Sequence, residues 1–140
     1  MKIGNKFPGT KKSVADVLLA THKSYLKPLT KLMAKVKVSG LAHITGGGLV
    51  DNVPRIMPGG LSAVIDRSSW KVPTVFQALE ELGRVDHEEM YRVFNMGIGM
   101  AVFVPKKDVE QAVTLLKKAG DRPRVIGRVA KGSQPVTFKN

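Results

Sequence analysis

The stretch GLAHITGGGL at residues 40–49 combines the signals that decide the fold of this chain. Residues 41–45 are mostly apolar and lie between glycines, which predicts a short strand that runs into a turn at residues 46–48. Because side chains alternate along a strand, we expect His43 and Thr45 on one face, directed towards the glycine turn. The sequence therefore predicts a strand end at which an imidazole, a hydroxyl and three glycines meet.

Further elements lie on both sides of this stretch, and they follow no regular alternation of strand and helix. Helices are predicted over residues 14–21, 27–36, 49–54, 73–82, 87–93 and 108–119, the first of them capped by Ser13. Strands are predicted over residues 61–66, 98–104, 124–129 and 136–138. Several strands have too little sequence between them for a parallel crossover. The expected fold class is α+β, with a mixed, mainly antiparallel sheet and packed helices.

The length of 140 residues suits one ordinary domain. We expect residues 13–140 to form that domain and residues 1–12 to be a flexible basic segment. The absence of cysteine excludes disulfides, thiolate metal sites and cysteine nucleophiles. No apolar run approaches the roughly 20 residues of a membrane helix. A cytoplasmic protein with no membrane partner is therefore expected.

The net charge of +12 is concentrated towards the N-terminus, where residues 1–37 hold nine lysines and a single acid, Asp16. Such an excess is typical of a solvated face or of a surface that meets an acidic neighbour, and it also attracts anions such as nucleotides. A basic, non-catalytic module that binds nucleic acid is an alternative. This stretch offers little support for it, because Phe7 and Tyr25 are its only aromatic residues and it has no recognised binding motif.

The glycine turn serves either as an anion site or as a plain tight turn. Backbone N–H groups without side chains at the start of a helix favour phosphate, and Gly46, Gly47 and Gly48 fit that description. The turn is neither a P-loop nor a dinucleotide fingerprint. His43 beside it is either a group that donates a hydrogen bond or moves a proton, or a half-buried histidine satisfied by the backbone.

A second glycine motif, FNMGIGM, occupies residues 94–100. Gly97 and Gly99 follow a predicted helix and precede a predicted strand, which is the reverse of the nucleotide-binding order. Asn95 beside them either contacts a ligand or forms the turn. The motif alone therefore leaves ligand binding open.

Metal-ligand patterns are not met in the sequence. The segment HEEM at residues 87–90 lacks a second histidine four residues after the first, because Tyr91 stands there. His22 has no partner at ligand spacing, and the carboxylates are scattered along the chain. No metal site is predicted.

Several stretches, taken together, resemble the C-terminal domain of aminoimidazole ribonucleotide synthetases, the phosphoribosylformylglycinamidine cyclo-ligases, in order and spacing. They are VSGLAHITGGGLVDNVPRIMPGGLSAVID at residues 38–66, WKVPTVF at 70–76, EEMYRVFNMGIGM at 88–100 and VIGRV at 125–129. The similarity covers residues 14–140. Residues 25–28 also resemble the family's Tyr-Val-Lys-Pro segment, but Thr21 and His22 replace the Pro-Thr that usually precedes it.

The resemblance implies an ATP-dependent ring closure in purine biosynthesis. ATP phosphorylates the amide oxygen of formylglycinamidine ribonucleotide, a nitrogen attacks that carbon, and phosphate leaves as the imidazole closes. The family's N-terminal domain supplies most contacts to Mg²⁺ and ATP and much of the homodimer interface. We expect that domain to be a separate partner, without which this chain is inactive. By position, His43 would be catalytic, and the residues that bind substrate or phosphate would be Thr45, Gly46, Gly47, Gly48, Asn95, Gly97 and Gly99.

Other enzymes of the same superfamily share this architecture. They are formylglycinamidine synthetase, selenophosphate synthetase, thiamine-phosphate kinase and the hydrogenase-maturation dehydratase. Their C-terminal motifs differ from FNMGIGM, which favours the cyclo-ligase interpretation.

Overall fold

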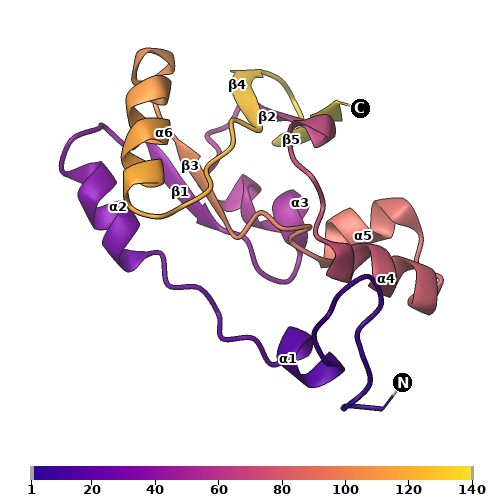
Figure 1. The fold of residues 1–140 in the computed structure, drawn as a ribbon. Coiled ribbons are helices and arrows are strands. Elements are labelled where there is room, and N and C mark those ends of the chain that lie inside the picture. Colours follow the sequence, from indigo (N-terminus) through magenta and orange to yellow (C-terminus); the bar gives the residue numbers. More distant parts are fainter. Residues whose placement is uncertain (1, 140) are drawn as a thin grey trace.

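The computed structural model describes residues 2–139, which form six α-helices and five β-strands (Figure 1). The helices are α1 (Val14–Leu18), α2 (Leu26–Met33), α3 (Gly48–Asn52), α4 (Thr74–Gly83), α5 (His87–Val93) and α6 (Val109–Lys118). The strands are β1 (Gly40–His43), β2 (Leu61–Asp66), β3 (Met100–Phe103), β4 (Gly127–Lys131) and β5 (Val136–Lys139). Three short 3-10 helices are η1 (Pro54–Ile56), η2 (Arg67–Ser69) and η3 (Lys106–Asp108). The predicted α+β class is confirmed.

The described strands form two sheets. In the first, β1 pairs antiparallel with β3, so that Ala42 lies opposite Ala101 and His43 opposite Met100. In the second, β2 is central, with β4 antiparallel on one side and β5 parallel on the other. The pairing is therefore mixed and mainly antiparallel, as expected, and the structure adds the division into two sheets.

The strand β1 separates two parts of the hydrophobic core. Ala42 and the following Ile44 are buried on one side, in a cluster completed by Leu49, Val53, Ala63, Ile65 and Ala101. Leu41 faces the other side, where α2 and α6 cover the ribbon through Leu29, Leu32 and Ala112. Figure 1 shows both helices beside β1 and β3. The alternation predicted from the sequence thus decides which side chains of β1 enter the core.

Helix α1 begins with a capping box. The Ser13 hydroxyl accepts a hydrogen bond from the backbone N–H of Asp16, and the Asp16 carboxylate accepts one from the N–H of Ser13. Hydrogen bonds from Ser13 lower the pKa of Asp16. The helix ends at Leu18, three positions earlier than Thr21, and the residues that follow it, 19–24, are exposed.

The N-terminal segment contacts the rest of the molecule through backbone hydrogen bonds to α1 and through one buried aromatic residue. Phe7 is only 2% exposed and packs with Val14 of α1 and Ala78 of α4. The expected boundary between residues 1–12 and 13–140 stays a prediction, and its two outer ends, residues 1 and 140, lie outside the described part of the chain. Within that part, no helix has the length and apolar character needed to cross a membrane.

Candidate functional site

The end of β1 presents two polar side chains to solvent. His43 and Thr45 are exposed, whereas the intervening Ile44 is only 1% exposed. The two polar residues therefore share a face, as the period of two predicts. Both are exposed at the point where the strand turns into α3.

The glycine turn is built for close packing. Gly47 and Gly48 have φ angles of +91° and +55°, in the left-handed region that glycine adopts without strain. A Cβ on Gly48 would collide with the carbonyl oxygen of Tyr91 and lie 2.7 Å from that of Phe94. Glycine at position 48 thus allows the turn to rest directly on the C-terminal end of α5.

Two of the three glycine amides are used within the protein. Gly47 N–H donates to the carbonyl of Val93 at 3.3 Å, and Gly48 N–H donates to that of Thr45 at 3.1 Å. In the described residues, the backbone N–H of Gly46 makes no such hydrogen bond. Among the described residues, the Gly46 amide is thus the one of the three without a backbone acceptor, and phosphate binding by this turn stays a prediction. The turn offers one free amide, beside the Thr45 hydroxyl, because the other two fix its conformation.

The FNMGIGM segment lies next to this turn, as expected. Ile44 N–H donates to the carbonyl of Gly99 at 3.0 Å, which ties the end of β1 to residues 95–99. The Asn95 side-chain oxygen accepts from Gly97 N–H at 2.9 Å, and Gly97 has a φ of +95°. Asn95 therefore acts in this structure as a turn former. We call residues 43–48 and 95–99 together the strand-end site.

A histidine outside the predicted set joins this site. His22 Nε2 lies 3.0 Å from His43 Nε2, and the two rings stack with centroids 5.1 Å apart. Tyr25 meets the His43 ring edge to face at 6.0 Å, and its own burial raises the pKa of its hydroxyl. The sequence offered His22 no partner at metal-ligand spacing, and the contact with His43 is of another kind. Ligand-spacing rules compare neighbours in sequence, whereas this contact joins residues 21 positions apart.

A cavity of about 800 Å³ lies between the two sheets. Its wall is largely apolar and includes Leu49, Val53, Ala63, Ile65, Val102 and Val129. Gly97 and Gly99 reach this wall, but His43, Thr45 and Gly46 do not line it. The strand-end site is therefore an exposed edge beside the cavity.

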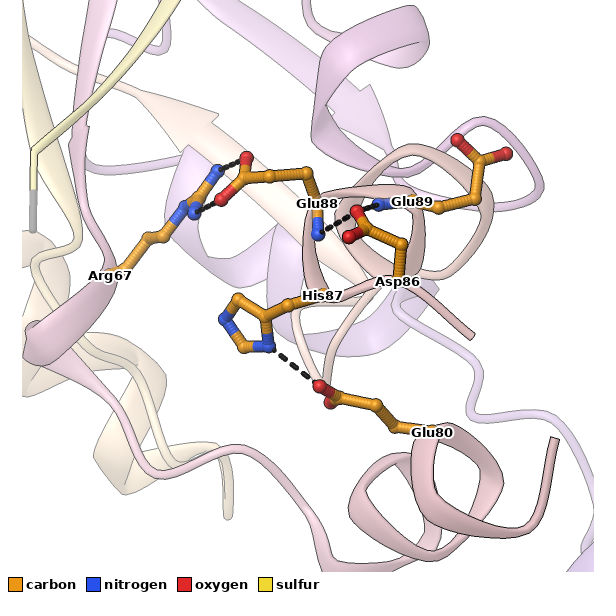
Figure 2. Close-up of polar contacts among 6 residues, drawn as sticks. All are labelled: Arg67, Glu80, Asp86, His87, Glu88 and Glu89. Carbon is orange, nitrogen blue, oxygen red and sulfur yellow. Dashed lines mark hydrogen bonds and ion pairs between the residues drawn. The ribbon is translucent and has the colours of Figure 1, made fainter. Parts of the chain in front are cut away.

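The carboxylates do not assemble into a metal site. Among residues 2–139, no three histidine, aspartate or glutamate side chains come together in a way that could hold a metal ion. Asp66 instead accepts hydrogen bonds from the backbone and hydroxyl of Ser68, which lower its pKa. Asp86 caps α5, and His87 contacts Glu80 at 2.9 Å (Figure 2). The described residues therefore do not fit a Mg²⁺ ion.

A second group of paired charges surrounds Arg67, which lies in η2 directly after β2. Arg67 binds Glu88 through two guanidinium nitrogens, at 2.5 and 2.6 Å (Figure 2). Its guanidinium carbon also lies 4.3 Å from the ring centroid of Tyr91 and 4.1 Å from that of Phe138. The ion pair lowers the pKa of Glu88 and raises that of Arg67. We call these four residues the arginine clamp, and it joins η2 and β5 to α5.

Comparison with known proteins begins with the fold. The structure is similar to the crystal structure of E. coli HypE, a hydrogenase maturation protein, with a TM-score of 0.62 and 20% sequence identity. The match covers 90% of this chain and 41% of that one. The α+β arrangement described above is therefore a known fold.

The chain belongs to the family described as "AIR synthase related protein, C-terminal domain", whose model matches residues 2–139. It is 43% identical to the phosphoribosylformylglycinamidine cyclo-ligase of Geotalea daltonii and 45% identical to that of Oceanobacillus iheyensis. Each match covers 92% of this chain, and 37% and 38% of the respective relatives. The predicted resemblance is confirmed, and the chain spans little more than a third of the length of these relatives.

Proposed function

We propose that this chain acts as the C-terminal part of a phosphoribosylformylglycinamidine cyclo-ligase in purine biosynthesis. The identity of 43 to 46% to enzymes of that name supports the assignment. The observation that carries it in the structure is the meeting of residues 43–48 with residues 95–99 at one exposed edge. Both of the quoted glycine motifs contribute to that edge.

The strand-end site has groups suited to the ring closure. The Thr45 hydroxyl and the Gly46 N–H are adjacent donors for a phosphate oxygen. A ring nitrogen of His43 accepts the proton that the attacking nitrogen loses as the ring closes. Gly47, Gly48, Asn95, Gly97 and Gly99 shape this edge and bring the donors close to the substrate.

The remaining parts of the reaction belong to other elements of the complete enzyme in this proposal. The described residues gather no carboxylate cluster, so Mg²⁺ and ATP are bound mainly by an N-terminal domain. Formylglycinamidine ribonucleotide then lies between the two domains. The complete protein is a cytoplasmic homodimer, and the 140-residue chain alone is inactive.

Mixing the chain with a separately produced N-terminal half tests this function. The expected result is ATP-dependent formation of the imidazole by the mixture and none by either part alone. His43→Ala should lower kcat about 100-fold or more, because it removes the proton acceptor. His87→Ala, an exposed histidine outside the site, is the matched control and should leave kcat unchanged.

Two outcomes would contradict the proposal. Ring closure by the pure chain with Mg²⁺ and ATP would show that the N-terminal half is not needed. A stable complex of the two halves that binds ATP but forms no imidazole would show that the chain has another function.

A further inference from the structure

We propose that His22 and His43 share a proton, and that His22 thereby sets which ring nitrogen of His43 is free to react. This role for His22 rests on the proposed function of His43. His22 lies in the segment where the sequence departs from the family pattern. The inference therefore concerns a feature of this chain.

The distance between the two rings requires a shared proton. At 3.0 Å, one Nε2 carries a hydrogen that the lone pair of the other Nε2 accepts. Two protonated rings would direct two N–H groups at each other, so at least one ring is neutral while the contact exists. When His43 donates, its Nδ1 is an acceptor; when His43 accepts, its Nδ1 carries a hydrogen and donates.

Two contacts hold His22 in place. The next residue, Lys23, forms an ion pair with Asp121, just beyond the end of α6. Tyr25 lies against Gly99, where a Cβ would collide with the tyrosine hydroxyl. Both sides of Ser24 are thereby attached to the fold, Lys23 to the end of α6 and Tyr25 to the strand-end site. His22 meets His43 because Lys23 and Tyr25 fix the segment that carries it.

No fixed charge competes with this pairing. The Tyr25 ring is the other aromatic group against both imidazoles, at 6.3 Å from His22 and 6.0 Å from His43. The ammonium group of Lys23 lies over the Tyr25 ring, with its Nζ 5.5 Å from the ring centroid. Among the described residues, no carboxylate forms a hydrogen bond or an ion pair with either imidazole. Each ring therefore has the other as its proton partner.

The two histidines together account for the proton that the substrate nitrogen loses. His43 Nδ1 takes the proton from the substrate nitrogen, and the hydrogen on His43 Nε2 passes to His22 Nε2. His43 ends neutral, and the positive charge resides on His22, which is exposed to water. His22 is a positioning residue in this scheme, since only His43 faces the substrate.

The first test needs only the 140-residue chain. Long-range ¹H–¹⁵N spectra at neutral pH report the tautomer of each histidine ring. His22→Thr should change the tautomer ratio of His43, whereas His87→Thr should leave it unchanged. His22→Gln keeps a hydrogen-bonding group and should restore a single tautomer. Identical His43 signals in the chain with His22 and in the His22→Thr chain, with the backbone amide spectrum preserved, would overturn the proposal.

The second test uses the mixture with the N-terminal half. His22→Thr and His22→Gln should both lower kcat about tenfold at unchanged KM, a smaller loss than for His43→Ala. The pH profile of kcat should lose one ionisation in both variants. An unchanged kcat and pH profile would overturn the relay. A mixture that is inactive with the wild-type chain contradicts the proposed function, whereas the spectra still decide whether the proton is shared.

Discussion

The arginine clamp and the strand-end site both contain polar groups next to packed core, but they use them in opposite ways. In the clamp, the side chain of Arg67 is 10% exposed, and its charge is matched by Glu88 and covered by two aromatic rings. At the strand end, His43, Thr45 and the Gly46 amide are exposed, and only His43 has a side-chain partner. The paired guanidinium nitrogens of Arg67 stabilise the fold, although its buried Nε has no hydrogen-bond partner among the described residues, whereas the exposed groups at the strand end are available to a ligand.

The contrast is not absolute, because the strand-end site also contains groups that serve the fold. Gly47 and Gly48 give their amides to neighbouring carbonyls, and Asn52 donates to the carbonyls of Gly46 and Gly48 at 3.1 and 2.8 Å. Substitutions can therefore separate the structural residues of this site from the ligand-facing ones. The four predictions below run from the largest expected effect to the smallest.

Gly48→Ala should destabilise the chain by at least about 3 kcal/mol, because the added carbon collides with backbone carbonyls at a φ of +55°. Urea unfolding followed by circular dichroism measures the change. Gly46→Ala is the matched control, since a Cβ there has no heavy atom within 4 Å, and it should change stability by less than about 0.5 kcal/mol. Equal effects of the two substitutions would show that the turn does not rest on α5.

Arg67→Met should lower the free energy of unfolding by about 2 kcal/mol. Methionine keeps the aliphatic packing, but it removes the two-nitrogen contact with Glu88 and both aromatic contacts of the guanidinium. Arg67→Lys should cost less, about 1 kcal/mol, because the charge remains while the planar geometry is lost. The same unfolding measurement applies. A loss for the lysine variant as large as for methionine would show that geometry, not charge, decides the clamp.

The clamp should also make stability depend on pH. The pKa of Glu88 is lowered from 4.5 by Arg67, so its contribution is complete above about pH 4.5 and is lost as the pH falls through the folded-state value. Glu88→Gln should therefore be less stable than the wild type at neutral pH. The difference in stability between the two chains should become smaller in acid. Melting temperatures of both chains across this range measure it. A difference in melting temperature that stays the same at every pH would mean that the carboxylate charge does not contribute to stability.

Thr45→Ala should have the smallest effect on stability, below about 0.5 kcal/mol, because the side chain is exposed and makes no hydrogen bond in the described structure. Its effect should appear on anion binding instead. Titration with phosphate should shift the Gly46 amide resonance in the wild type and shift it less in the variant. If phosphate shifts other amide resonances but not that of Gly46, the turn is not an anion site.

The sequence predicted the fold well where a local signal was strong. The strand at Leu61–Asp66 and the helix at His87–Val93 have the bounds that were expected from their patterns. The fourth strand was less well placed, because β4 begins at Gly127 instead of residue 124. Pairing with β2 determines this start, because the backbone of Gly127 lies so close to the carbonyl of Val64 that a Cβ would collide with it.

The site was predicted in part for a related reason. Local periodicity correctly placed His43 and Thr45 on one exposed face, and the two glycine motifs together indicated the family. The use of the Gly47 and Gly48 amides could not be predicted, because their acceptors depend on how the chain packs around them. The contact between His22 and His43 likewise depends on a segment without regular structure. The catalytic and binding roles of these residues stay predictions.

The pairing of β1 with β3 has a consequence for ligand binding. It closes the chain from residue 44 to residue 99 into one large loop, and the strand-end site forms where the two ends of that loop meet. An anion that contacts both ends of the loop should bind only when the loop is closed. By mass action it should raise the melting temperature of the whole domain, by an amount equivalent to about 2.7 kcal/mol at 100 times its dissociation constant.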